Sequence, residues 1–248
     1  MKMKSLLLKE INSFFSSFTG YLVIIVFLLL NSSFLWIFRG SYNILENGYA
    51  SIDSLFAIAP WIFLFLVPAI TMRTFAEEKK SGTIELLYTR PVSEWQITLS
   101  KFLAAWLLVL IALLPTLIYF LTVFLLGSPV GNVDTGGTWG SYIGLVFLGG
   151  IYAALGIFSS SLTDNQIVAF ILSVVLSFFF YLGFGLVSTI FSTGEIIHVF
   201  EKLGIEYHYS SVSRGVIDSR DIMYFFGVIV IFLLATRYVL MTRKWKAA

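Results

Sequence analysis

The fold follows from one stretch of sequence in which a charged segment separates two long apolar runs. The stretch reads LFAIAPWIFLFLVPAITM (55–72), RTFAEEKKSGTIELLYTRPVSEWQITLSK (73–101) and FLAAWLLVLIALLPTLIYFLTVFLL (102–126). A helix needs about 20 apolar residues to cross the hydrocarbon core of a bilayer, and both flanking runs have roughly that length. The sequence therefore predicts two membrane-spanning helices joined by a polar connector.

The rest of the chain has the same character. Hydrophobic residues make up 58% of the 248 residues and charged residues only 12%, which leaves too little polar surface for a soluble protein. Four further apolar runs lack the alternation of β-barrel strands. We therefore expect an all-α integral membrane protein, a single domain over residues 1–248, with spans at about 21–38, 55–72, 102–126, 139–158, 167–191 and 222–241.

The basic residues predict the orientation of these spans. Twelve of the 16 lysines and arginines are predicted on the same side of the membrane as the termini and segment 73–101. The four on the other side are Arg39, Lys202, Arg214 and Arg220. Basic residues are enriched in cytoplasmic segments, so we expect both termini in the cytoplasm and the chain in the inner membrane. The net charge of +2 then reflects topology, and the expected partner is the lipid bilayer, not nucleic acid.

Three shorter helices are predicted outside the spans. The first 18 residues place Leu7, Ile11 and Phe14 on one face, typical of an elbow helix lying in the membrane interface. In the connector, Ser81-Gly82-Thr83 can begin a short helix, and Ser93 with Gln96 forms a capping box for the next one.

The third short helix is predicted on the outer side, before the last span. Ile196, Val199, Phe200 and Leu203 recur at helical spacing, and Gly204 is placed to end an amphipathic or re-entrant helix. Asp218 or Asp221 can then cap the last span.

Two spans carry residues that affect packing. Pro115 lies near the middle of the third span and is expected to kink it, because proline removes a backbone hydrogen bond. The fourth span is rich in glycine and alanine, with spacings such as Gly140 and Gly144 that allow close helix approach. The sequence leaves open whether this span packs within the subunit or against a second one.

The chain lacks the motifs of an enzyme. It has no cysteine, no nucleotide-binding G-x-x-x-x-G-K-[ST] loop, no H-E-x-x-H and no G-x-S-x-G, and its two histidines, His198 and His208, lie in one outer segment. The predicted span interiors also lack ionisable side chains, which ion-coupled carriers usually need. We therefore expect no catalytic, metal or cofactor site, and energy for any uphill transport would come from another subunit.

The connector carries a family resemblance. The run EEKKSGTIELL (77–87), followed by Pro91-Val92-Ser93 and then Lys101, resembles the cytoplasmic loop of ABC-2 type transporter permeases, in which acid, Gly-Thr, Glu, Leu-Leu and Pro follow in this order. Segments 20–22, 59–61, 127–132, 165–170 and 213–221 are similar to the GldF family, the permease subunits of the gliding-motility-associated ABC transporters of Bacteroidetes.

This resemblance implies a six-span subunit that works with a separate GldA-like ATPase, which binds the ATP, and with a GldG-like membrane subunit or a second copy of itself. It also implies that the short helix of the connector is a coupling helix seated in a groove of the ATPase. The residues to which this role falls are Glu77, Glu78, Gly82, Thr83, Glu85, Leu86 and Leu87. The alternative is a membrane scaffold or assembly factor that recruits a cytoplasmic partner through segment 73–101 without transporting anything.

Overall fold

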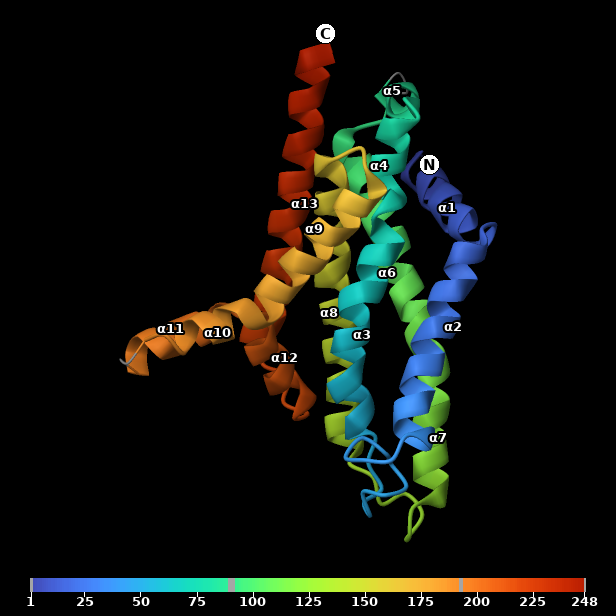
Figure 1. Cartoon of the computed structure of the whole chain (residues 1–248), viewed down its shortest axis with the longest axis vertical. Coiled ribbons are helices and arrows are strands. Elements are labelled where there is room, and N and C mark those ends of the chain that lie inside the picture. The colour runs from blue at the N-terminus through green and yellow to red at the C-terminus, as the bar shows by residue number, and fades with distance from the viewer. Residues whose placement is uncertain (1, 89–91, 192–193, 248) are drawn as a thin grey trace.

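The computed structural model describes residues 2–88, 92–191 and 194–247, and within those ranges it contains helices and no strand. Six segments are long and apolar enough to cross a membrane: Gly20–Ile37, Asp53–Lys80, Glu94–Leu126, Thr135–Leu162, Gln166–Ser188 and Ser219–Thr242. The predicted all-α class and the six spans are therefore confirmed. Figure 1 shows α1 (Lys2–Phe15), α5 (Thr83–Tyr88) and the last turns of α13 (Ser219–Ala247) at the same end of the bundle.

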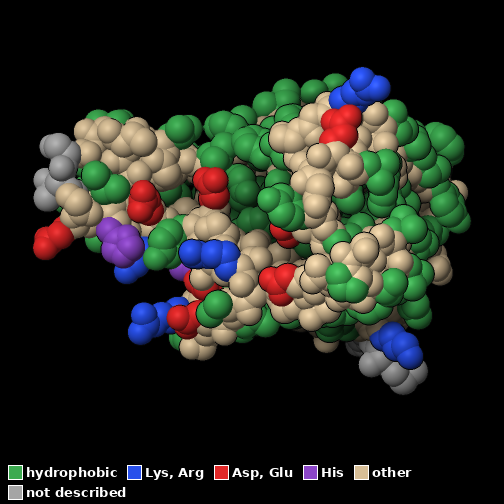
Figure 2. Space-filling view, turned by 90° about the horizontal axis from the view of Figure 1, so that it is seen from below, with side chains coloured by type: hydrophobic (Ala, Val, Ile, Leu, Met, Phe, Trp, Pro, Cys, Tyr) green, Lys and Arg blue, Asp and Glu red, His purple; other side chains and the backbone are tan. Residues whose placement is uncertain are grey.

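The opposite end of the bundle carries the connections between the first two spans and between the third and fourth. Figure 2 looks onto this end, where acidic side chains are spread among apolar and uncharged ones. In the connection between the first two spans, Glu46 forms an exposed ion pair with Arg39 and accepts a hydrogen bond from the backbone N–H of Gly40.

Helix α8 (Thr135–Leu162) is the centre of the bundle. It packs against α3 (Asp53–Thr71), α6 (Glu94–Leu113), α9 (Gln166–Phe178), α12 (Ile205–Ser213) and α13. Glycines make the close packing possible: a Cβ on Gly149 would lie 2.6 Å from a methyl carbon of Val109, and one on Gly156 would lie 1.9 Å from the Thr71 hydroxyl. These small residues of the fourth span therefore pack within the subunit.

The second span extends further than predicted. Its first part, α3, ends at Thr71, and after a break at Met72 the chain continues as α4 (Arg73–Lys80). The expected end near residue 72 thus corresponds to an interruption, and part of the charged connector is a helical extension of the span. This extension carries the connector's first charges away from the apolar part of the bundle.

The third span is interrupted at Pro115, as predicted. Helix α6 begins after the capping box of Ser93 and Gln96, which is confirmed, and therefore starts before the expected residue 102. A 3-10 turn, Leu114–Thr116, separates α6 from α7 (Leu117–Leu126). The carbonyl of Thr116 accepts a hydrogen bond of 3.0 Å from the Tyr142 hydroxyl of α8, so the interruption is held by the central helix.

The N-terminal elbow is also present. Helix α1 ends at Phe15, and two residues separate it from α2 (Phe18–Ser32), which starts at an angle to α1 (Figure 1) and continues in a π-helical turn over Ser33–Ile37. The elbow is tight, since a Cβ on Gly20 would lie 2.6 Å from the carbonyl oxygen of Phe14. The predicted place of α1 in the membrane interface stays a prediction.

The outer segment before the last span contains one helix more than predicted. The fifth span continues from α9 through a π-helical turn, Phe179–Gly183, into α10 (Phe184–Ser188), and α11 (Gly194–Leu203) follows. In Figure 1, α10 and α11 leave the bundle sideways. The predicted helix and its end at Gly204 are confirmed, but α12 was missed, and it returns to the bundle beside α8.

Polar contacts hold α12 in place. Burial raises the pKa of Tyr209 above its usual range, so its hydroxyl stays protonated and donates a hydrogen bond of 2.8 Å to the carbonyl of Phe56. Of the two predicted caps of the last span, Asp218 accepts from the backbone N–H of Arg220. Asp221 does not cap; its carboxylate lies 2.6 Å from His208 Nδ1.

Candidate functional site

The connector folds into two helices that meet at a glycine. Helix α4 ends where the N–H of Ser81 donates to the carbonyl of Glu77 and the N–H of Gly82 donates to that of Lys79. Gly82 has a φ of 71°, a left-handed conformation that only glycine adopts without strain. The chain therefore changes direction here, and the predicted short helix follows as α5.

Helix α5 lies at the far end of the bundle and is exposed there (Figure 1). Leu86 is 64% exposed and has the exposed Glu85 next to it in the chain, whereas Ile84 packs against the core. The side chain of Leu87 lies outside the part of the structure that is described. The exposed Leu86 is therefore accessible to a partner protein.

Helix α4 is fixed to α8 by a buried serine. Ser160 Oγ accepts from the backbone N–H groups of Phe75 and Ala76, both at 3.0 Å, and donates to the carbonyl of Met72 at 2.9 Å. The Lys79 ammonium donates to the carbonyl of Ser161. Ser160 thus bridges the break between α3 and α4, and it sets the position of α4 relative to the central helix.

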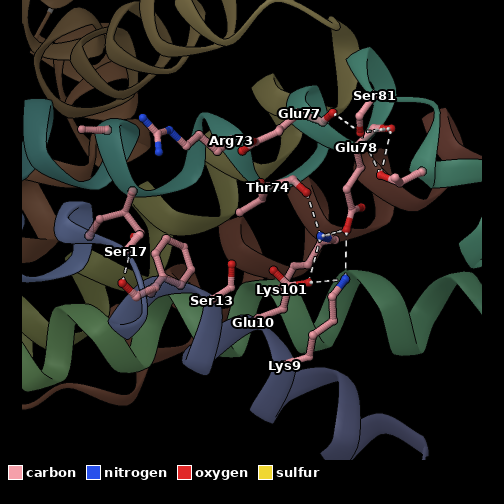
Figure 3. A pocket seen from close by; sticks show the side chains of 14 residues that line it. Lys9, Glu10, Ser13, Ser17, Arg73, Thr74, Glu77, Glu78, Ser81 and Lys101 are labelled. Carbon is pink, nitrogen blue, oxygen red and sulfur yellow. Dashed lines mark hydrogen bonds and ion pairs between the residues drawn. The ribbon is translucent and has the colours of Figure 1, made fainter.

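On its other side, α4 is tied to α1 and α6 through Lys101. This side chain is only 2% exposed, and its ammonium lies 2.7 Å from the Thr74 carbonyl, 3.0 Å from a Glu78 oxygen and 3.1 Å from a Glu10 oxygen (Figure 3). The ammonium donates hydrogen bonds to the Thr74 carbonyl and to the Glu10 carboxylate, and the Glu78 carboxylate completes the cluster as an ion pair. Lys9 lies 3.6 Å from the same Glu78 oxygen and adds a second, more exposed, positive charge.

A groove of about 410 Å³ runs beside this cluster, between α1 and α4. Ser13 of α1 and Ser17, which follows α1, line one wall, Arg73 and Glu77 line the other, and Lys101 is also part of the lining (Figure 3). The charged groups of the connector therefore divide into two sets. One set is exposed around α5, and the other is turned inward between α1, α4 and α6.

The structure separates the residues that were predicted to contact an ATPase. Glu77, Gly82, Thr83, Glu85 and Leu86 lie on the exposed side of α4 and α5. Glu78, in contrast, points toward Lys101 and its side chain is only 14% exposed. Thr83 makes local hydrogen bonds to the Ser81 hydroxyl and to the Glu78 carbonyl, which hold the start of α5.

Sequence reasoning missed the residues that hold α4 in place, which are Lys9, Glu10, Lys101 and Ser160. One signal was present: Glu10 occupies the same face of α1 as Phe14, among residues that are otherwise apolar. A carboxylate on an apolar face requires a buried partner. The position of that partner, 91 residues away, could not be read from spacing.

Six apolar spans and a charged helical connector at one end of the bundle define a polytopic membrane protein. Residues 39–238 match the family described as ABC-2 family transporter protein, and the chain belongs to this family. It is the membrane permease subunit of an ABC-2 type transporter; such subunits lack the nucleotide-binding domain and pair with ABC ATPase subunits. No curated protein matches the chain.

Proposed function

We propose that this permease subunit works in an inner-membrane transporter of the gliding-motility type, with GldF as its nearest functional counterpart. Its partners would be a GldA-like ATPase, which binds ATP, and a GldG-like membrane subunit or a second copy of this chain. Residues 1–248 would form one transmembrane domain with both termini in the cytoplasm. The similarity of segments across most of the chain to GldF supports this assignment.

The ATPase contact is proposed to be α5 together with the exposed side of α4. The observation that carries it is the combination of an exposed Leu86 and Glu85 with a base that is fixed on both sides, by Ser160 and by Lys101. A contact element must be accessible to bind its partner, and it must be rigidly attached to pass on a displacement. The Glu78 carboxylate contributes to the rigid attachment through its ion pair with Lys101.

Closure of the paired ATPases would push on α5, and the displacement would reach the second and third spans through α4 and α6. Both spans have an interruption at which they can bend, at Met72 and at Leu114–Thr116. The result would be export of a cargo or transmission of force to the outer side.

Affinity purification of the tagged chain from its native membrane tests the proposal. Wild type and Leu86→Asp are compared by mass spectrometry and by ATPase activity of the purified complex. We expect an ABC ATPase with wild type and its loss with Leu86→Asp. The matched control is Val130→Asp, at a similarly exposed position (67%) at the opposite end of the bundle, which should retain the ATPase.

Two outcomes would count against the proposal. Recovery of the ATPase with Leu86→Asp would exclude α5 as the contact. Absence of any ATPase from the wild-type complex would favour a scaffold, and a wild-type phenotype in cells with a hydrolysis-deficient ATPase would support that reading. The gliding-motility role itself is tested by deleting the chain and scoring cell movement on a surface.

A further inference from the structure

The cluster around Lys101 joins three parts of the chain that are distant in sequence. Glu10 belongs to α1, Thr74 and Glu78 to α4, and Lys101 to α6. These elements have different tasks in the proposed function, because α4 carries the ATPase contact, α6 is the first half of the third span and α1 is the elbow. The Lys101 ammonium therefore connects α4, which carries the proposed ATPase contact, to α1 and to α6.

The cluster resists separation because of its burial. The Lys101 side chain is 2% exposed, and the Glu10 and Glu78 side chains are 12% and 14% exposed. Moving α1 or α4 away would leave a charged group desolvated without its partner, which is far more costly than breaking an exposed ion pair. The aromatic ring of Phe75, 5.1 Å from the ammonium, closes the cluster from α4 and adds a cation–π contact.

The second span is interrupted just beyond the cluster, and the third span is interrupted 13 residues after Lys101. On the second span, the break at Met72 lies two residues before Thr74, and on the third span, the 3-10 turn at Leu114–Thr116 ends α6. Between these interruptions and the end of the bundle that carries α5, the two spans consist of the regular helices α4 and α6. The segments on this side are joined through Lys101, and the parts of the spans beyond the interruptions are not.

We propose that Lys101 is a positioning residue for energy coupling, which fastens α1 and α6 to α4 so that the three move as one body when the ATPase acts on α5. This body includes the end of α8 to which Ser160 ties α4, and it bends against the remainder of the bundle at Met72 and at Leu114–Thr116. This inference rests on the proposed ATPase contact for its direction of movement. The fastening itself, however, is a property of the isolated chain and can be measured without the ATPase.

Spin labels can report the fastening directly, because the chain contains no cysteine. One pair, Asn12→Cys with Lys80→Cys, joins exposed positions of α1 and α4 within the proposed body. A second pair, Lys80→Cys with Val130→Cys, joins that body to the opposite end of the bundle. Distance distributions are measured by pulsed electron paramagnetic resonance, for the chain alone and for the complex with and without ATP under hydrolysis-blocking conditions.

We expect the first pair to give one narrow distribution that does not move with nucleotide, and the second pair to shift on ATP binding. In Lys101→Met the distance distribution of the first pair should become broader or split, whereas in Lys101→Arg it should stay narrow. Should Lys101→Met fail to fold, Glu10→Gln should broaden the first distribution instead, because it removes the charge that ties Lys101 to α1.

A nucleotide-dependent shift of the first pair in the otherwise unmodified chain would overturn the inference, and so would an unchanged narrow distribution in Lys101→Met. Failure of the proposed function has a different signature. In that case no ATPase accompanies the chain, yet the comparison of Lys101→Met with Lys101→Arg in the isolated subunit still decides whether Lys101 fastens α1 to α4.

Discussion

The hydroxyl oxygen of Ser160 lies 3.0 Å from the backbone nitrogen of Phe75, 85 residues away in the chain. Through this contact and its partners at Ala76 and Met72, the central helix α8 replaces hydrogen bonds that the second span loses at its break. The position of the proposed ATPase contact therefore depends on a serine in another span, as well as on Lys101 at the other side of α4.

Ser160→Ala should lower the stability of the subunit by about 1–3 kcal/mol, because buried backbone groups lose their partner. The adjacent Ser159 is an ideal control, since it is equally buried but bonds only to the Leu155 carbonyl of its own helix. Thermal unfolding in detergent should show a clear decrease for Ser160→Ala and little change for Ser159→Ala. Equal decreases for the two variants would mean that the hydrogen bonds from Ser160 to α4 do not contribute to stability.

Gly82→Ala should disturb the turn between α4 and α5. The left-handed conformation costs an alanine about 1–2 kcal/mol, whereas asparagine tolerates it better. No atom lies within 4 Å of a Cβ at this position, so steric clashes do not complicate the comparison. We expect less ATPase to co-purify with Gly82→Ala than with Gly82→Asn, and equal recovery would contradict the importance of this turn.

Gly156→Ala should strain the contact between α8 and α3. The new methyl group would lie 1.9 Å from the Thr71 hydroxyl, and overpacking of this kind typically costs about 1–3 kcal/mol. Gly227→Ala in α13 is the control, because nothing lies within 4 Å of a Cβ there. The midpoint of thermal unfolding should decrease for the first variant and stay unchanged or increase for the second.

Asp221→Asn should loosen the outer helices. His208 donates through Nε2 to the Lys202 carbonyl and contacts Asp221 through Nδ1, so it links α11, α12 and α13. A buried hydrogen bond to a charged group contributes about 1.5–3 kcal/mol. Asp218→Asn is the control, since asparagine caps a helix as well as aspartate does. Thermal unfolding should separate the two variants, and identical midpoints would argue against a structural role for this pair.

The orientation can be tested with single cysteines. We expect a membrane-impermeant maleimide to label Val130→Cys in intact spheroplasts and to label Lys4→Cys only after permeabilisation, because twelve of the 16 basic residues lie with the termini. Labelling of Lys4→Cys in intact spheroplasts would reverse the predicted topology.

The spans were predictable because each contains an apolar run long enough to cross a bilayer, and such runs have few alternatives. Local signals were equally reliable. Pro115 predicted the interruption of the third span, Ser93 and Gln96 predicted the start of α6, and Gly204 predicted the end of α11.

Contacts between distant segments could not be predicted in this way. Lys101 was assigned to the charged connector by its position, yet its partners come from α1 and α4 and bury it completely. Helix α12 was missed because its buried face contains His208 and Tyr209 and does not resemble an apolar stripe. Both cases involve polar groups whose burial becomes favourable only when the fold supplies a partner.

The close packing around α8 also limits where a cargo can travel. Helices approach this span so tightly that added methyl groups at Gly149 and Gly156 would collide with Val109 and Thr71. The middle of the subunit is therefore occupied by protein. In the proposed transporter, a passage for cargo would therefore run along the outside of this bundle, with the neighbouring membrane subunit as its other wall.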